Sequence, residues 1–392
     1  MEKNSTIYKD KTYVANTYAR FPIELVSGKG STVIDSEGKE YTDLGTGIAV
    51  NGFGVADDEW VAAVTDQLGK LQHSSNLYYT GPCASLAEQL CLRTGMKKVF
   101  FSNSGAEANE CAIKCARLWA EKKKGKEYYN IITLKNSFHG RTITTLAATG
   151  QDVFHESFTP MTEGFLYATA NDIESVKALV KENKCAAIMV EPVQGEGGVM
   201  ALEVEFVRAL RKLADENDML LMFDEVQTGN GRTGYLYGYE HFGVKADVIS
   251  TAKGLAGGLP LGATMFFEGC DNVLTAGLHG STFGGNPICA AAAVSVLSRI
   301  DEALLSSVRE KSKFIFDSLS SAEGVKSVSG LGLMIGIETV GDASKIIAKC
   351  MEEGILPIKA KNKVRLLPAL NIPMDQLEKA VAILKKVIKE FS

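Results

Sequence analysis

The sequence lacks the features that would indicate a membrane, secreted or disulfide-rich protein. It has no apolar run of about 18 residues, so we expect no transmembrane helix. Residues 1–11 are polar and contain no apolar region of a signal peptide. The eight cysteines form no CxxC pair. Because buried, reduced thiols suit the cytosol, we expect a cytoplasmic protein with no metal site and no membrane contact.

The sequence also has little net charge. Its 42 basic and 47 acidic side chains give a formal charge of −5, which disfavours nucleic acid as a partner but leaves a local anion site open. A hydrophobic content of 45% and a charged content of 23% are typical of a globular protein with a large core. The length of 392 residues suggests two to three domains.

Short apolar runs alternate with helical patterns through most of the chain. This alternation predicts an α/β fold, with a mostly parallel central sheet covered by helices on both faces. The expected strands are residues 99–101, 131–134, 186–190, 220–223, 248–252 and 263–267. The expected helices between them include residues 106–124, 173–182 and 203–217.

The pattern changes after about residue 287 and predicts a smaller α+β domain. Two N-terminal strands joined by a turn, 31–35 and 40–43, are expected to pack with it. We therefore expect an N-terminal segment over 1–45, a large domain over 46–287 and a small domain over 288–392. The elements expected in the small domain are helices over 288–305, 308–319 and 343–353, strands over 332–338 and 364–367, and a helix from Met374.

A helix start after the strand at 99–101 is the first candidate site. Ser104 and Glu107 have the spacing of a capping box, and Gly105 and Ala106 leave the first amides of the helix open. Free amides at the positive end of a helix dipole bind anions, so the segment predicts a phosphate site. The alternative is a well-capped helix without a ligand.

Two charged side chains stand where expected strands end. Asp224 follows an apolar strand and could keep a ring nitrogen protonated, or it could be a loop residue satisfied by backbone amides. Lys253 follows the next strand and precedes a glycine-rich turn. Desolvation in a crevice would favour its neutral, nucleophilic amine, whereas most lysines are solvated at the surface.

Two further segments have a possible chemical role, and a third matches a nucleotide-binding pattern. Phe138 and Arg141 could stack on a planar ring and hold a carboxylate, or Arg141 could be in a surface ion pair and His139 purely structural. Residues 279–287 could bind phosphate or cap a helix. Residues 229–234 match G-x-G-x-x-G, but no small-residue helix start follows, so we do not expect a dinucleotide site.

Taken together, six ordered motifs resemble those of the class III aminotransferases, which use pyridoxal 5′-phosphate, and are most similar to the acetylornithine aminotransferase branch. The resemblance extends from about Phe21 to the end of the chain. It implies fold type I. The motifs are SGAEANE at 104–110, FHGRT at 138–142, EPVQGEGG at 191–198, DEVQTGNGRTG at 224–234, the Lys253 segment, and HGSTFGGNP at 279–287.

The resemblance implies a role for each residue of the site. Lys253 would form a Schiff base with the cofactor, Asp224 would pair with the pyridine nitrogen, and Gln227 would contact the ring hydroxyl. Thr282 would reach the phosphate in the neighbouring subunit, which implies a homodimer. The implied cofactor-binding set is Ser104, Gly105, Ala106, Phe138, Asp224, Glu225, Val226, Gln227, Lys253 and Thr282. The implied substrate-binding set is Arg141, Ser281, Glu196 and Arg365.

The implied reaction moves the terminal amine of N2-acetyl-L-ornithine to 2-oxoglutarate, giving N-acetyl-L-glutamate 5-semialdehyde and L-glutamate in arginine biosynthesis. Arg365 would bind the α-carboxylate of glutamate, and Glu196 would pair with Arg365 while the amine donor is bound. Gly47 stands where ornithine aminotransferases carry Tyr and would leave room for an acylated amine. At 54–58 the chain departs from the Gly-His-x-His-Pro pattern common in the family.

Several other functions remain open on the sequence. Within the family, the amine donor could be ornithine, succinylornithine, succinyldiaminopimelate or 4-aminobutyrate, because small pockets discriminate acyl size weakly. Outside it, the alternatives are a non-catalytic cofactor-binding protein and a nicotinamide-dependent dehydrogenase.

Overall fold

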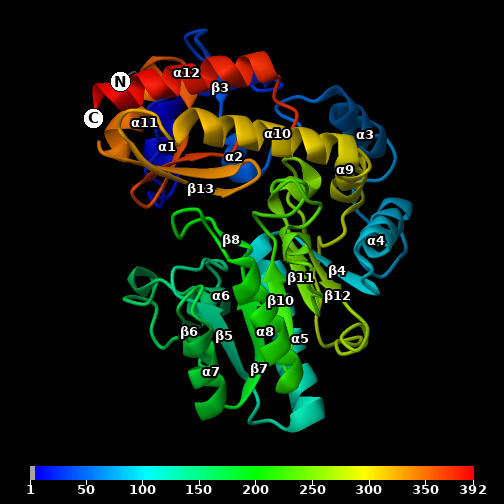
Figure 1. Ribbon diagram of the computed structural model, residues 1–392. Helices are drawn as coiled ribbons and strands as arrows, with labels where there is room; N and C mark the ends of the chain where they lie inside the picture. Colours follow the sequence, from blue (N-terminus) through cyan, green and yellow to red (C-terminus); the bar gives the residue numbers. More distant parts are fainter. Residues whose placement is uncertain (1–4) are drawn as a thin grey trace.

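The computed structural model describes residues 5–392, so the first four residues of the predicted N-terminal segment lie outside the described part. Its centre is a seven-stranded sheet with helices on both faces (Figure 1). The strands are β4 (Lys98–Ser102), β5 (Asn130–Leu134), β6 (Phe165–Ala168), β7 (Cys185–Val190), β10 (Leu220–Asp224), β11 (Val248–Thr251) and β12 (Gly262–Phe266). A small hairpin beside it consists of β8 (Val193–Gln194) and β9 (Met200–Ala201).

Alternate residues of the central strands belong to two separate cores. In β10, Leu221 and Phe223 pack with the residues of one helix layer, while Leu220 and Met222 pack with the other. Side chains of a strand point alternately to opposite faces, so apolar residues at every position require cover on both sides. The helices between residues 46 and 297 are α2 (Thr46–Ala49), α3 (Asp58–Leu68), α4 (Gly81–Thr94), α5 (Gly105–Lys124), α6 (Ile143–Ala148), α7 (Ile173–Glu182), α8 (Val204–Glu216) and α9 (Pro287–Leu297), with 3-10 helices η1 (Asp152–Phe154), η2 (Gly238–Phe242) and η3 (Lys253–Ala256).

The strand order is β4-β12-β11-β10-β7-β5-β6, and the pairs are parallel except those that β12 makes. The predicted mostly parallel sheet is thus confirmed. Asp224 of β10 pairs with Ser250 of β11, three residues before Lys253. The two candidate residues therefore follow neighbouring strands at the same edge of the sheet.

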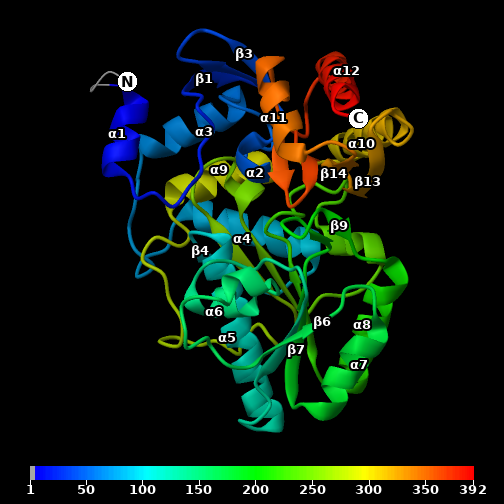
Figure 2. The ribbon, with the colours of Figure 1, turned by 90° about the vertical axis from the view of Figure 1, so that its left-hand side faces the viewer.

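The N-terminal and C-terminal segments form the upper part of the molecule in Figure 2. One sheet has the order β13-β14-β17-β16, and a second joins the N-terminal strands to β15 in the order β1-β2-β3-β15. This pairing agrees with the expected packing of the N-terminal strands, and the domain boundaries themselves stay a prediction. The elements are α1 (Thr6–Tyr13), β1 (Leu25–Lys29), β2 (Thr32–Asp35), β3 (Glu40–Asp43), α10 (Glu302–Leu319), β13 (Val325–Leu331), β14 (Met334–Thr339), α11 (Ala343–Glu352), β15 (Ile355–Leu356), β16 (Ile358–Ala360), β17 (Lys363–Leu366) and α12 (Met374–Glu390).

The helix expected over 288–305 is a correction to the sequence analysis. The chain leaves the helical conformation after Leu297, and the next helix starts at Glu302. The Asp301 side chain accepts a hydrogen bond from the amide of Leu304 at 2.8 Å, so Asp301 is an N-cap rather than a residue inside a helix.

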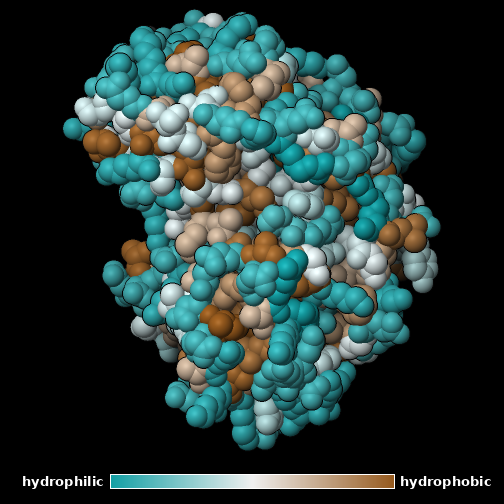
Figure 3. All heavy atoms as spheres, viewed as in Figure 1, coloured by the Kyte–Doolittle hydropathy of each residue, from teal (hydrophilic) through white to brown (hydrophobic). Residues whose placement is uncertain are grey.

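In the space-filling view the surface is hollowed where the upper part meets the central sheet (Figure 3). Among residues 5–392, no helix combines the length and the apolar character that a membrane span requires.

Candidate active site

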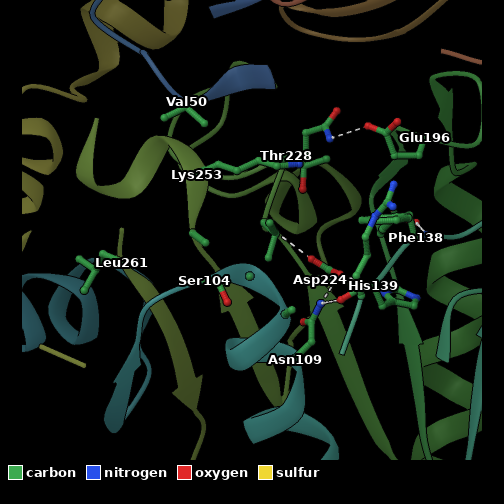
Figure 4. A pocket seen from close by; sticks show the side chains of 18 of the residues that line it. Val50, Ser104, Asn109, Phe138, His139, Glu196, Asp224, Thr228, Lys253 and Leu261 are labelled. Carbon is green, nitrogen blue, oxygen red and sulfur yellow. Dashed lines mark hydrogen bonds and ion pairs between the residues drawn. The ribbon is translucent and has the colours of Figure 1, made fainter. Parts of the chain in front are cut away.

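A cavity of about 460 Å³ lies at the carboxyl ends of the parallel strands (Figure 4). Its walls come from the segments that follow β4, β5, β7, β10 and β11, together with Val50 and residues 258–261. Of the residues expected in the site, it brings together Ser104, Gly105, Ala106, Phe138, Arg141, Glu196, Asp224, Val226, Gln227 and Lys253.

Asp224 lies buried at the floor of this cavity. Its Oδ2 accepts hydrogen bonds from Asn109 Nδ2 at 2.7 Å and from His139 Nδ1 at 2.8 Å, and its Oδ1 accepts one from the amide of Val226 at 3.0 Å. The interaction with the carboxylate fixes the proton of His139 on Nδ1. Figure 4 shows Asn109 and His139 on either side of Asp224. Three donors thus hold the carboxylate in one orientation.

Asn109 was not among the residues expected in the site, and His139 was open between a structural and a functional role. Asn109 also donates to the carbonyl of His139 at 2.7 Å and accepts a hydrogen bond from Ser250, so it ties α5 to β11 and to the segment after β5. The signal that could have found Asn109 is its position one helical turn after Gly105, on the same face of α5.

Lys253 is a half-buried residue that reaches into the cavity. Burial lowers the pKa of its amine, and the nearby carboxylates of Glu196 and Asp224 oppose this shift. Its backbone has a φ of +45°, in the left-handed region that non-glycine residues adopt only when their surroundings hold them there. The amine is therefore both desolvated and fixed in place, as a nucleophile requires.

The N-terminus of α5 faces the same cavity. Ser104 Oγ accepts from the amide of Glu107 at 3.2 Å, and Glu107 Oε2 accepts from the amide of Asn103 at 2.7 Å. The capping box expected from the sequence is thus present in a variant that reaches back one residue further. A Cβ on Gly105 would lie 2.5 Å from Val226 Cγ1, so only glycine allows this approach. The first amides of the helix have no partner within the helix and can bind an anion.

Glu196 and Arg365 form an ion pair at the opening between the two parts of the molecule. Arg365 Nη1 donates to Glu196 Oε1 at 2.6 Å and to Gln227 Oε1 at 3.2 Å. The Arg365 side chain is 3% exposed and that of Glu196 is 33% exposed. Burial alone would raise the pKa of Glu196, but the positive charges of Arg365 and Lys253 outweigh it and lower that pKa. Arg365 does not itself line the cavity; it reaches it through Glu196 and Gln227.

Three other residues expected in the site lie outside this cavity. Glu225 points away from it: its carboxyl group accepts from the amides of Gly238 and Tyr239, and burial raises its pKa to about 7. Ser281 and Thr282 line a second cavity of about 440 Å³. The two cavities meet where Asn103 Nδ2 donates to Ser281 Oγ at 3.2 Å.

Glu191 is a buried carboxyl group whose role the motif did not reveal. Its Oε2 accepts a hydrogen bond from the amide of Phe138 at 2.9 Å. Burial and the nearby Asp224 raise its pKa well above the ordinary value. A neutral Glu191 adds no second negative charge beside Asp224 and fixes the backbone that carries the Phe138 ring.

These groups fit pyridoxal 5′-phosphate. The α5 N-terminus suits the phosphate, the Asp224 carboxylate suits the ring nitrogen, and the desolvated Lys253 amine suits the aldehyde. The Phe138 ring lies in the wall beside Asp224 (Figure 4), and the Nε2 atom of His139 is buried with no hydrogen-bond partner. The fold and the site therefore define an enzyme of fold type I that depends on pyridoxal 5′-phosphate.

Comparisons with known proteins give the family. The sequence profile described as Aminotransferase class-III matches residues 13–388. Acetylornithine aminotransferase of Haemophilus ducreyi is 47% identical, over 97% of this chain and 98% of that protein. The enzyme of the same name from Caldanaerobacter subterraneus is 45% identical, over 97% and 98%. The chain belongs to the class-III aminotransferases.

Solved structures agree with this assignment. N-acetylornithine aminotransferase from Stenotrophomonas maltophilia superposes with a TM-score of 0.85 at 33% identity, over 98% of this chain and 99% of that one. Ornithine aminotransferase from Toxoplasma gondii superposes with a TM-score of 0.94 at 30% identity, over 98% and 94%.

Proposed function

We propose that this enzyme transfers the terminal amino group of N2-acetyl-L-ornithine to 2-oxoglutarate, giving N-acetyl-L-glutamate 5-semialdehyde and L-glutamate, a step of arginine biosynthesis. The observation that carries the proposal is one cavity that holds the Lys253 amine and the Glu196 carboxylate, with the buried guanidinium of Arg365 paired to Glu196 behind the cavity wall. Relatives named acetylornithine aminotransferase at 41–47% identity support the choice of amine donor.

Each half-reaction needs a proton moved at the substrate carbon that carries the amino group. When bound, the cofactor supplies an aldehyde that takes up the amino group and a ring that accepts electrons. The Lys253 amine would move this proton from the substrate carbon to the aldehyde carbon of the cofactor, and in the reverse direction in the opposite half-reaction. Burial lowers the pKa of Lys253 and so favours the neutral amine that this step needs. Asp224, fixed by Asn109 and His139, stabilises positive charge on the ring nitrogen.

The Glu196–Arg365 pair allows one site to accept two differently shaped substrates. An amine donor that reacts at its far end has no α-carboxylate beside the reacting carbon, so Glu196 keeps the charge of Arg365 compensated. Glutamate and 2-oxoglutarate have a carboxylate there, and it replaces Glu196 on the guanidinium. Arg141, in the wall beside Phe138, is left for the distal carboxylate.

Gly47 supports an acylated donor. It lies in α2, a left-handed turn, with a φ of +63°, where a side chain would be strained. By the family resemblance, ornithine aminotransferases carry Tyr at this position, and a glycine three residues before Val50 of the cavity wall favours a donor with an acylated α-amine.

A homodimer is part of the proposal. The second cavity holds Thr282 next to exposed apolar side chains, among them Tyr78, Tyr79 and Phe283. Exposed apolar patches of this kind mark interaction sites. We infer that a second copy of the chain covers this surface, and that Thr282 contacts the phosphate in the partner's site.

All eight cysteines are free thiols, which supports a reducing, cytoplasmic location.

Turnover of alternative amine donors tests the proposal. Purified holoenzyme is assayed with 2-oxoglutarate and either N-acetylornithine, ornithine, N-succinylornithine or 4-aminobutyrate. We expect the highest kcat/KM for N-acetylornithine, and a preference for ornithine or 4-aminobutyrate would refute it. Borohydride reduction followed by peptide mapping should fix the cofactor to Lys253, and a label elsewhere would overturn the assignment of the site.

A further inference from the structure

The loop 229–234 has the glycine pattern of a nucleotide site but lies in the interior of the protein. Asn230 is 5% exposed and Arg232 is 3% exposed. The loop follows β10 and the Asp224 segment, and it lies between the central sheet and the C-terminal strands. Buried polar side chains need hydrogen-bond partners, and the partners of Asn230 and Arg232 indicate what this loop does.

Toward the central sheet, Asn230 holds the segment that ends in Lys253. Its Nδ2 donates to Thr251 Oγ1 at 3.1 Å and to the carbonyl of Ala252 at 3.2 Å. The second bond acts on the peptide group that joins Ala252 to Lys253. It therefore restrains the backbone just where Lys253 takes its left-handed conformation.

Toward the C-terminal strands, Arg232 holds the segments on either side of Arg365. Its Nη1 donates to the carbonyl of Leu333 at 3.1 Å and to the carbonyl of Pro368. Pro368 follows Arg365 by three residues, and Leu333 immediately precedes β14, which pairs with Arg365 through Gly336. Pro368 thus lies in the segment that carries Arg365, and Leu333 lies next to the strand that pairs with this segment.

A second side chain holds the same C-terminal segment. Thr46 Oγ1 donates to the carbonyl of Leu367 at 2.6 Å, next to the carbonyl that Arg232 binds. Asp43 Oδ1 accepts from the amide of Thr46 at 2.8 Å. Burial raises the pKa of Asp43, and the positive charge of Arg232 counteracts this, so the two buried charges compensate each other.

We propose that Asn230 and Arg232 are positioning residues that fix the Lys253 amine and the Arg365 guanidinium relative to each other. This inference rests on the proposed function, in which Arg365 binds the carboxylate beside the reacting carbon of 2-oxoglutarate. That carboxylate then places the reacting carbon opposite Lys253. The amine donor does not use Arg365, so its half-reaction does not depend on Arg232.

Single-turnover kinetics of the two half-reactions test this difference. In Arg232→Lys, we expect the second-order rate constant with 2-oxoglutarate to fall about tenfold or more, and that with N-acetylornithine to change less than about twofold. In Asn230→Ala, both rate constants should fall together, because Lys253 acts in both half-reactions.

The control is Arg309→Ala. This change removes a 2.6 Å hydrogen bond to the carbonyl of Gly234 in the same loop but no hydrogen bond to the segments around Arg365. Both of its rate constants should stay within about twofold of wild type.

Binding of glutarate, a dicarboxylate that cannot react, gives a readout independent of turnover. Its dissociation constant, measured by calorimetry, should rise about tenfold in Arg232→Lys and stay unchanged in Arg309→Ala. If Arg232→Lys does not fold, Thr46→Val takes its place, because Thr46 holds the carbonyl next to that of Pro368. In Thr46→Val, too, we expect the rate constant with 2-oxoglutarate to fall more than the rate constant with N-acetylornithine.

Equal losses in both half-reactions of Arg232→Lys or its substitute, or no loss in either, would overturn the inference. Failure of the proposed function looks different: wild-type enzyme would then prefer another amine donor to N-acetylornithine, or would not react with 2-oxoglutarate at all.

Discussion

Removal of the Glu196 carboxylate should shift the enzyme toward reaction with glutamate at its α-amine. In wild type, the α-carboxylate of glutamate must displace Glu196 from Arg365, with which it forms a hydrogen bond of 2.6 Å. Hydrogen bonds to charged groups contribute about 1.5–3 kcal/mol. Because the Glu196 side chain is 33% exposed, we take the lower end of this range. Since each 1.36 kcal/mol is a factor of ten, Glu196→Ala should raise the glutamate rate constant about tenfold.

The assay follows the absorbance of the bound cofactor in single-turnover experiments with glutamate and with N-acetylornithine. The ratio of the two rate constants should move toward glutamate, because the guanidinium of Arg365 is then uncovered also when the amine donor binds. A matched control is Glu353→Ala. Glu353 is 30% exposed and is paired with Lys349 and Lys386, and it does not line the cavity. An unchanged ratio in Glu196→Ala would show that the ion pair does not govern substrate exchange.

Three further perturbations test other parts of the site. Asp224→Asn should keep the fold but lower kcat by about a hundredfold to a thousandfold, since the ring nitrogen loses its anionic partner; a loss below tenfold in steady-state assays would contradict the role of Asp224. Gly105→Ala should weaken cofactor affinity, seen as an increased dissociation constant in reconstitution of the apoenzyme, because its Cβ would lie 2.5 Å from Val226. Glu225→Gln should reduce the pH dependence of stability. The pKa of Glu225 in the folded protein, about 7, exceeds its value in the unfolded chain. The free energy of unfolding of wild type is therefore highest at low pH, where Glu225 is protonated in both states, and it decreases as pH rises toward 7. Melting temperatures of both proteins between pH 5 and pH 8 should therefore differ in slope, and parallel curves would be evidence against a buried, protonated Glu225.

The strand ends were the part of the site that the sequence could predict. Asp224 comes at the end of an apolar strand and Lys253 comes just after the next strand, and parallel strands bring such positions to one edge. The partners of Asp224 could not be predicted in this way. Asn109 and His139 are 115 and 85 residues away from Asp224, and only the pairing of distant strands brings them to it.

The same limit applies to the fold. Most strands of the central sheet were predicted, whereas β6 and β13 were missed. β6 is an edge strand of only four apolar residues, and so short a run does not distinguish a strand from a piece of helix. β13 contains polar residues and a glycine, so it lacks the apolar run of a central strand. The Glu196–Arg365 contact was expected only through the family resemblance, because the two residues are 169 positions apart.

The pairing of β3 with β15 has a consequence for how the chain is made. Thr42 pairs with Ile355, so the N-terminal hairpin leaves the ribosome long before its last neighbour has been synthesised. At 5–20 residues per second, the 312 residues between Thr42 and Ile355 take roughly 15–60 s to translate. During this interval the edge of β3 is unprotected, and chaperones that bind exposed strand edges have their main opportunity to act.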